Sequence, residues 1–98
     1  MNTVAMRLPS TVTIGTYAAI EADLLAVIAS GRGVLHIDAS GVVEMDSMAI
    51  AVLLYAQRLA RRAGRPGIDV LGAPPALLAL LRVYGVDSLM SLSPAMDC

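Results

Sequence analysis

The sequence has no tryptophan, phenylalanine or lysine, and Cys98 is the single cysteine among its 98 residues. One cysteine cannot form a disulfide within the chain, and His36 with Cys98 falls short of the about four ligands of a structural zinc site. All seven basic residues are arginine, and eight acidic residues give a net charge of −1. Phosphate binding needs a basic excess and base stacking needs aromatic rings, so this composition argues against a nucleic-acid partner.

Long apolar runs are also absent. The longest run, from Met48 to Ala56, is about half of the ~20 residues that a membrane-spanning helix needs, so no direct membrane insertion is expected. No charged region followed by an apolar stretch opens the chain, so we expect no secretory signal and a cytoplasmic location. Hydrophobic residues nevertheless make up 57% of the chain. Because a domain this small has little interior, part of its apolar surface is expected to face a partner.

Strands and helices are predicted to alternate through one domain over residues 1–98, with its core at about 4–92. Short apolar segments predict strands at 3–8, 34–37 and 67–71, an extended piece at 11–14, and a last short strand or hook within 86–92. Residues 38–45 are predicted to form a loop and the tail from Ser93 to fray. This order favours an α/β fold in which helices pack against a small mixed sheet.

Three helices are expected between these strands. The first follows Thr16 as N-cap and ends at the glycines 31 and 33. The second runs over 48–63 after Ser47 as N-cap and ends at Gly64. The third begins at the prolines 74–75 and ends before Gly85, and the spacing of its apolar residues predicts a buried stripe of Leu77, Leu80, Leu81 and Tyr84.

Few residues suit catalysis or cofactor binding. His36 lies inside an apolar strand, where a lone histidine is more typical of a core or edge position than of a catalytic base. The carboxylates of Asp38, Glu44 and Asp46 could hold Mg²⁺, but acids at such positions more often cap turns and helix N-termini. The glycines at 31 and 33 end a helix instead of beginning one, unlike a phosphate-binding loop. We therefore assign no catalytic residue, metal or cofactor, although residues distant in the sequence can still meet.

The helix over 48–63 has two different sides when its residues are placed 100° apart. The side predicted to pack on the sheet carries mostly small apolar residues, namely Ala49, Val52, Leu53, Ala56, Leu59, Ala60 and Ala63. The opposite side carries Ser47, Ile50, Ala51, Leu54, Arg58, Arg61 and Arg62. The arginines identify this second side as the solvent side, so Ile50 and Leu54 are expected to be exposed.

Exposed aliphatic residues beside arginines are typical of a protein-binding patch, for which we name Ser47, Ile50, Ala51, Leu54 and Arg58. The alternative is an ordinary surface helix. In that case Ile50 and Leu54 are stray exposed residues, and the arginines complement the negative end of the helix dipole.

Three short motifs, in this order, resemble the STAS domain family over about residues 4–92. They are Asp38-Ala39-Ser40 after an apolar strand, Asp46-Ser47-Met48-Ala49-Ile50 opening a helix, and Ala73-Pro74-Pro75 followed by Val83-Tyr84-Gly85-Val86. The second and third motifs together are most similar to the MlaB-like STAS subunits of phospholipid-transporting ABC systems. Anti-sigma factor antagonists resemble the chain more distantly, since they more often have glycine where Ala49 stands.

The resemblance implies a small sheet with helices mainly on one face, and a function without catalysis. An MlaB-like subunit would bind and regulate the cytoplasmic ATPase of an Mla-type ABC phospholipid transporter, with Ser47 in the contact. Through that partner it would lie at the inner face of the inner membrane. An anti-sigma factor antagonist would instead bind an anti-sigma factor kinase, and Ser47 would then be a phosphorylation site. Met48 and Ala49, which replace smaller residues, argue more against kinase recognition than against binding.

Overall fold

The computed structural model describes residues 4–93, in which short strands alternate with helices as predicted. In chain order the elements are β1 (Met6–Arg7), β2 (Thr11–Val12), α1 (Tyr17–Ile28), β3 (Leu35–Asp38), β4 (Glu44–Met45), α2 (Met48–Arg62), β5 (Ile68–Leu71), α3 (Pro75–Val83), the short 3₁₀ helix η1 (Asp87–Leu89) and β6 (Ser91–Ser93). The predicted α/β fold class is confirmed, but all strand pairs among residues 4–93 are parallel, whereas a mixed sheet was expected.

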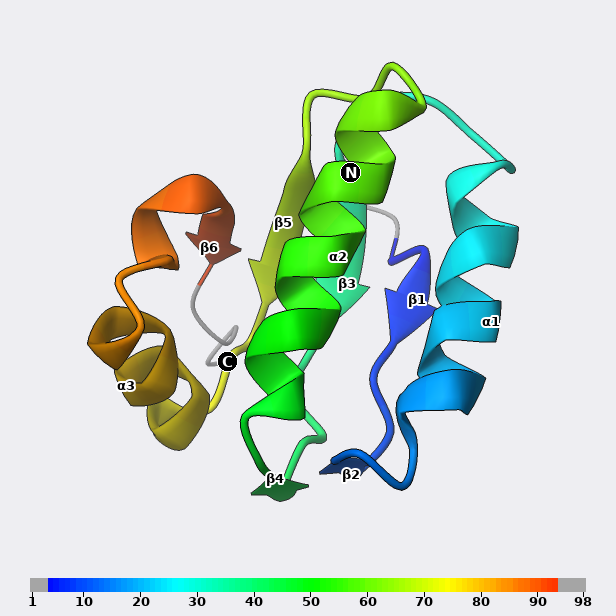
Figure 1. The fold of residues 1–98 in the computed structure, drawn as a ribbon. Helices are drawn as coiled ribbons and strands as arrows, with labels where there is room; N and C mark the ends of the chain where they lie inside the picture. The colour runs from blue at the N-terminus through cyan, green and yellow to red at the C-terminus, as the bar shows by residue number, and fades with distance from the viewer. Residues whose placement is uncertain (1–3, 94–98) are drawn as a thin grey trace.

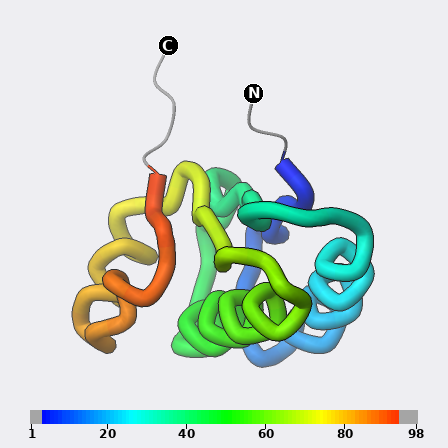
Figure 2. Tube along the Cα trace, turned by 90° about the horizontal axis from the view of Figure 1, so that it is seen from above, coloured from blue at the N-terminus to red at the C-terminus, as the bar shows by residue number. Residues whose placement is uncertain are grey.

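Four strands form one sheet in the order β1-β3-β5-β6, and each neighbouring pair is parallel. Parallel neighbours need a crossover connection, and α1, α2 and α3 supply the three crossovers in turn. The helices lie side by side on one face of the sheet, with α2 in the middle (Figures 1 and 2). The short strands β2 and β4 form a separate parallel pair near the beginning of α2 (Figure 1).

The core lies between the sheet and the helix layer. On β3 and β5, buried aliphatic residues alternate with half-buried residues of the opposite face, as the pleat of a strand requires. The helices contribute buried side chains to this core: Ile20, Leu24, Ile28, Ala49, Ile50, Val52, Leu53, Ala56, Ala60, Leu77 and Leu81. Three of the six from α2 are alanines, which let the backbone of this helix approach the sheet closely.

Glycines end α2 and α3 as predicted. Gly64 and Gly85 have φ of +85° and +70°, a left-handed conformation that glycine adopts without a Cβ clash. The following N–H groups then reach back into each helix: Arg65 donates to the Ala60 carbonyl at 2.9 Å, and Val86 donates to that of Leu81 at 3.0 Å. Both ends are therefore Schellman motifs, and the first of them fixes the position of Arg65.

Two predictions about packing and loops are wrong. Tyr84 is 53% exposed because α3 ends at Val83 and the chain turns at Gly85, so the predicted stripe stops at Leu81, with Leu80 half-buried. The predicted loop over 38–45 contains β4, a strand of two residues that is too short to leave a sequence pattern. Ser93 lies in β6, whereas residues 94–98, including Cys98, lie outside the described residues.

Candidate functional site

Asp46, not Ser47, caps α2. Its Oδ1 accepts a hydrogen bond from the Met48 N–H at 2.8 Å, and its Oδ2 accepts one from the Ile14 N–H at 3.3 Å. Ser47 already has helical angles, φ −62° and ψ −13°, and its side chain makes no capping bond. The prediction that Ser47 supplies the cap is therefore wrong. The consequence for function is that the Ser47 side chain is exposed and its hydroxyl is not engaged in capping.

Two strongly exposed aliphatic residues lie at the β2–β4 pair, next to this serine. Ile14 is 76% exposed and Val43 is 81% exposed. Ile14 follows β2 and is tied to Asp46 through its N–H, whereas Val43 precedes β4 and donates its N–H to the Ser10 carbonyl at 2.9 Å. The exposed hydrophobic side chains at this end of α2 therefore come from loops, which the helical periodicity of 48–63 could not reveal.

Thr16 shapes the loop that carries Ile14. Its hydroxyl accepts a hydrogen bond from the Thr13 N–H at 3.1 Å and donates toward the Thr11 carbonyl at 3.0 Å. Its side chain makes no bond to the first N–H groups of α1, so the predicted N-cap role is wrong. The hydroxyl instead braces the turn between β2 and α1, which holds Ile14 outward.

The residues of the predicted patch on α2 differ in their exposure, and Leu54, which was expected to be exposed, is not fully so. Ser47 and Arg58 are exposed, and Ala51 and Leu54 are half-buried. The prediction that Ile50 is exposed is wrong, because only 4% of this residue is accessible to solvent. A patch that includes Ile50 therefore does not exist on the surface of this chain.

The burial of Ile50 follows from the position of α2 between two other helices. Gln57, two turns after Ile50 and so on the same flank of the helix, donates its Nε2–H to the Leu89 carbonyl of η1 at 2.7 Å. This flank faces the α3–η1 side, while α1 packs against the other flank. A central helix is thus buried over a wider arc than a helix that is covered only by a sheet.

Two of the three neighbouring carboxylates follow the capping alternative, whereas Glu44 accepts a hydrogen bond from the Thr11 hydroxyl at 3.4 Å. Asp46 caps α2, and Asp38 accepts a hydrogen bond from the Ser40 N–H at 2.9 Å. Hydrogen bonds from Ser40, and secondarily the charge of Arg7 with its Nε 3.6 Å from Oδ2, lower the pKa of Asp38, although its burial acts in the opposite direction. Over residues 4–93 no three histidine, cysteine or acidic side chains are grouped as metal ligands.

His36 lies on the face of the sheet that the helices leave open. Its Nε2 is 3.8 Å from Oδ2 of Asp69, and the Ser93 hydroxyl donates to the same carboxylate at 2.9 Å. The acid therefore stands between the serine and the histidine. A nucleophilic serine needs the histidine next to its own hydroxyl, so this row of side chains is an inter-strand contact and not a catalytic triad.

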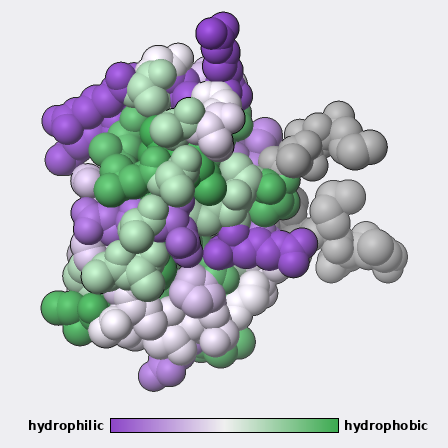
Figure 3. Space-filling model, turned by 90° about the vertical axis from the view of Figure 1, so that its right-hand side faces the viewer, coloured by the Kyte–Doolittle hydropathy of each residue, from purple (hydrophilic) through white to green (hydrophobic). Residues whose placement is uncertain are grey.

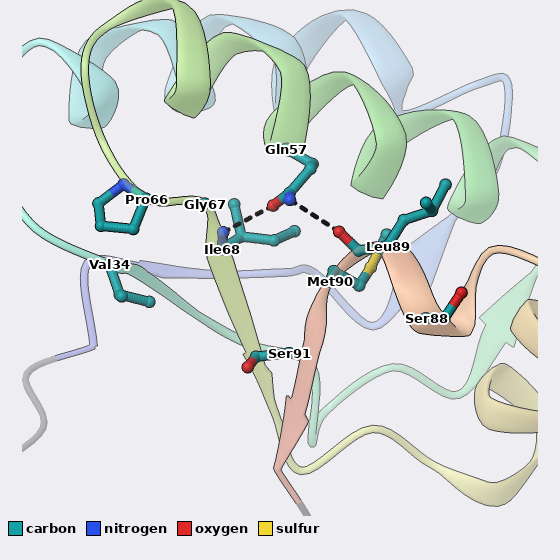
Figure 4. A pocket seen from close by; sticks show the side chains of 9 residues that line it. All are labelled: Val34, Gln57, Pro66, Gly67, Ile68, Ser88, Leu89, Met90 and Ser91. Carbon is teal, nitrogen blue, oxygen red and sulfur yellow. Dashed lines mark hydrogen bonds between the residues drawn. The ribbon is translucent and has the colours of Figure 1, made fainter.

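A shallow pocket of about 320 Å³ opens at the beginning of β5 and β6 (Figure 4). Gln57 bridges its wall, since Oε1 accepts the Ile68 N–H at 2.8 Å and Nε2 donates to the Leu89 carbonyl. The amide passes so close to Gly67 that a Cβ there would lie 2.8 Å from Oε1. Both ends of the amide are engaged, so Gln57 joins α2, β5 and η1 instead of offering a free group to a ligand.

Known structures share this architecture. A STAS-domain anti-sigma-factor antagonist from Planctomyces limnophilus superposes with a TM-score of 0.77 at 17% identity, over 92% of this chain and 80% of that one. A Thermotoga maritima protein assigned as an anti-sigma factor antagonist gives a TM-score of 0.75 at 11% identity, over 95% of this chain and 82% of that one. At such identities the likeness concerns the fold alone. No curated protein has significant sequence similarity to the chain.

The sequence itself matches a family model described as "Mlab, STAS domain" over residues 1–92. Domains of this kind are regulatory modules that bind other proteins and generally have no enzymatic activity. None of the helices over residues 4–93 has the length and hydrophobicity needed to cross a membrane. The match extends over nearly the whole sequence, and the chain belongs to the STAS domain family.

Proposed function

We propose that the chain is a non-enzymatic subunit that binds the ATPase of an Mla-type ABC phospholipid transporter. Its contact surface would be the beginning of α2 with the adjoining β2–β4 pair, which we call the docking end: Ile14, Val43, Ser47, Ala51 and Leu54. Ile50 is left out because it is buried. The family match to the MlaB-like branch supports the choice of partner.

One observation carries the choice of surface: the exposed Ser47 side chain is free of capping, and the β2–β4 pair near the beginning of the same helix carries the exposed Ile14 and Val43. A small polar side chain at the centre of an apolar rim allows close approach of a partner backbone, and the apolar rim excludes water from the contact. By binding one arrangement of the ATPase more tightly than another, the subunit would bias its assembly or activity.

The Ser47 hydroxyl also favours a second candidate, a phosphorylation-controlled anti-sigma factor antagonist whose partner is an anti-sigma factor kinase. The similar solved structures are described as anti-sigma factor antagonists. A phosphate would add about −1.5 to −2 charges at Ser47, next to the Asp46 carboxylate and within the apolar docking end. Binding would then be switched off by modification, and the helix itself would tolerate it because its dipole favours negative charge at this end.

Binding of Ser47 variants to the purified transporter ATPase of the same organism, measured by calorimetry, separates the two candidates. Ser47→Thr should bind like the wild type, Ser47→Ala should lose less than about fivefold in affinity, and Ser47→Arg should abolish binding through bulk and buried charge. Ser88→Arg, the same change at an exposed serine of η1, is the matched control and should bind normally.

A switch gives another pattern. Ser47→Ala would then bind its kinase permanently, Ser47→Asp would not bind, and the kinase would phosphorylate the wild-type chain. Stoichiometric phosphoserine at Ser47 in cells, together with release of the partner, would replace the transporter proposal with the antagonist.

A further inference from the structure

The end of the molecule opposite the docking end is strongly basic, although the whole chain has a net charge of −1. Residues 47–68 contain Arg58, Arg61, Arg62 and Arg65 and no acidic residue, and residues 24–37 contain Arg32 and no acidic residue. The loops that follow α1 and α2, which carry Arg32 and Arg65, lie at the same end of the fold, where both helices terminate (Figure 1). From the α1 side, strongly hydrophilic residues project from this upper end (Figure 3).

Arg65 shows that the two segments meet there. Its guanidinium is buried, and it donates to the carbonyls of Val27 and Ile28 at the end of α1 and to that of Gly33. These carbonyls are neutral, so they do not cancel the positive charge of Arg65. That charge adds to the positive electrostatic potential at this end of the molecule. The negative ends of the α1 and α2 dipoles lie here and stabilise nearby arginines. This explains why the fold tolerates several arginines at one end, and their positive charge is still available to a partner.

Three of the arginines continue the docking end along the outer face of α2. Arg58, Arg61 and Arg62, which we call the arginine cluster, are exposed. They lie on the same side of the helix as Ser47, Ala51 and Leu54, because all six residues fall within about 60° of one direction at 100° per residue. None of the three forms an ion pair with a residue among 4–93.

The acidic residue of α1 that acts on α2 is Glu21. The pKa of Tyr55 is raised first by its partial burial and then by the Glu21 carboxylate, while Arg62 acts in the opposite direction. Arg61 directs its Nε toward the Pro66 carbonyl, which is neutral. The three exposed arginines thus keep their positive charge without a carboxylate partner among residues 4–93.

We infer that the partner which binds the docking end also presents an acidic segment to the arginine cluster. This inference rests on the proposed function and specifies the chemistry of its partner. Ser47 and Arg62 are 15 residues apart, about 22 Å along a helix, so one protein interface of ordinary size covers both. Guanidinium groups suit carboxylates geometrically because they offer paired N–H donors.

The positions of the charges favour a protein over an anionic surface or a nucleic acid. The cluster contains only three exposed arginines, and the same face of α2 carries half-buried Ala51 and Leu54 beside an uncharged serine. Acidic residues at the opposite end, Glu44 and Asp46, would be repelled by an extended array of phosphates. A protein partner can present an acidic segment to the arginine cluster and an uncharged surface to the docking end.

The test measures association of the full-length chain with the transporter ATPase at about 50 and about 300 mM NaCl. Changing all three cluster residues to glutamine should slow association about tenfold at the lower salt and remove most of its salt dependence, with a much smaller effect on dissociation. Arg82→Gln, at an exposed arginine of α3 outside the cluster, should leave both rates within about twofold. Matching thermal unfolding of all variants shows that each is folded.

Different failures point to different errors. If the triple variant associates like the wild type while Ser47→Arg still abolishes binding, the acidic segment is wrong and the docking end stands. If the wild type does not bind the ATPase at all, the proposed function and this inference both fall. If the chain alone binds vesicles with about 30% anionic phospholipid and the triple variant does not, the cluster serves a membrane surface instead, and the inference is overturned.

Discussion

At the two ends of α2, side chains of opposite charge bind free backbone groups, those of α2 itself and the loop after β2 at the beginning, and those of α1 and the loop after it at the end. At the beginning, the Asp46 carboxylate accepts free N–H groups, and at the end, the Arg65 guanidinium donates to free carbonyls, although those belong to α1. The first arrangement frees Ser47 for contact at the surface. The second buries one arginine and leaves three others pointing outward. Asp46 therefore leaves Ser47 available to a partner at one end, and Arg65 is the one arginine of α2 and its following loop that is buried at the other.

The middle of α2 should contribute most to stability, because it supports both ends. Leu53 is fully buried, whereas its neighbour Leu54 is half-buried on the outer face. Leu53→Ala should lower the free energy of unfolding by about 2–5 kcal/mol, since it loses apolar burial and leaves a cavity. Leu54→Ala should cost less than about 1 kcal/mol. Urea unfolding of both variants checks this, and equal losses would mean that the two faces of α2 are assigned incorrectly.

At the basic end, the free energy of unfolding should depend more on the buried arginine, Arg65, than on the exposed arginines. Arg65→Met keeps the aliphatic stem but removes the donors that satisfy the carbonyls of Val27, Ile28 and Gly33. The expected loss is about 1–3 kcal/mol, because hydrogen bonds from charged groups exceed neutral ones in strength.

Arg62→Met is the control for this prediction and should change stability by less than about 0.5 kcal/mol, since Arg62 is exposed. Thermal unfolding measures both variants. If the two lose the same amount, Arg65 does not join α1 to α2, and the two ends of the helix are not held by comparable contacts.

The sequence predicted the alternation of elements and the ends of the helices, but not how they pack sideways. Periodicity identifies the centre of a buried face, as it did for Leu53 and Ala56. It does not give the width of that face, which depends on neighbouring helices. Ile50 was misplaced for this reason, because the α3–η1 side covers its flank of α2.

The choice of cap was also beyond the reach of the sequence. Asp46 and Ser47 are adjacent and both are good capping residues. The sequence alone therefore does not show which of the two precedes the first helical residue and caps the helix. The pairing of β2 with β4 decides it, because this pair places the Ile14 N–H against Asp46. Strands of two residues leave no alternation to detect, so Ile14 and Val43 could not be assigned to the site from their own neighbourhood.

At the beginning of α2, the prediction is that the acid matters for stability and the serine does not. Asp46→Ala removes the acceptor for two N–H groups and should cost about 1 kcal/mol, within the range measured for helix caps. Ser47→Ala should cost less than about 0.5 kcal/mol, because the hydroxyl caps nothing. Chemical denaturation distinguishes them, and a larger loss for Ser47→Ala would restore the serine as the cap.

The smallest expected effect is a pH dependence of stability that comes from Asp38 at the end of β3. The pKa of Asp38 is lowered in the folded chain, chiefly by hydrogen bonds from Ser40, so its ionised form stabilises the fold. This contribution is fully present above the pKa of an unfolded aspartate, about 4, and is lost as the pH falls through the lower folded value. Asp38→Asn, which keeps an oxygen acceptor for the Ser40 N–H, should be less stable than the wild type at pH 7. The difference should shrink as the pH is taken from about 5 toward 3. Urea unfolding across this range measures it. Parallel curves for the two proteins would show that Ser40 does not favour the ionised acid.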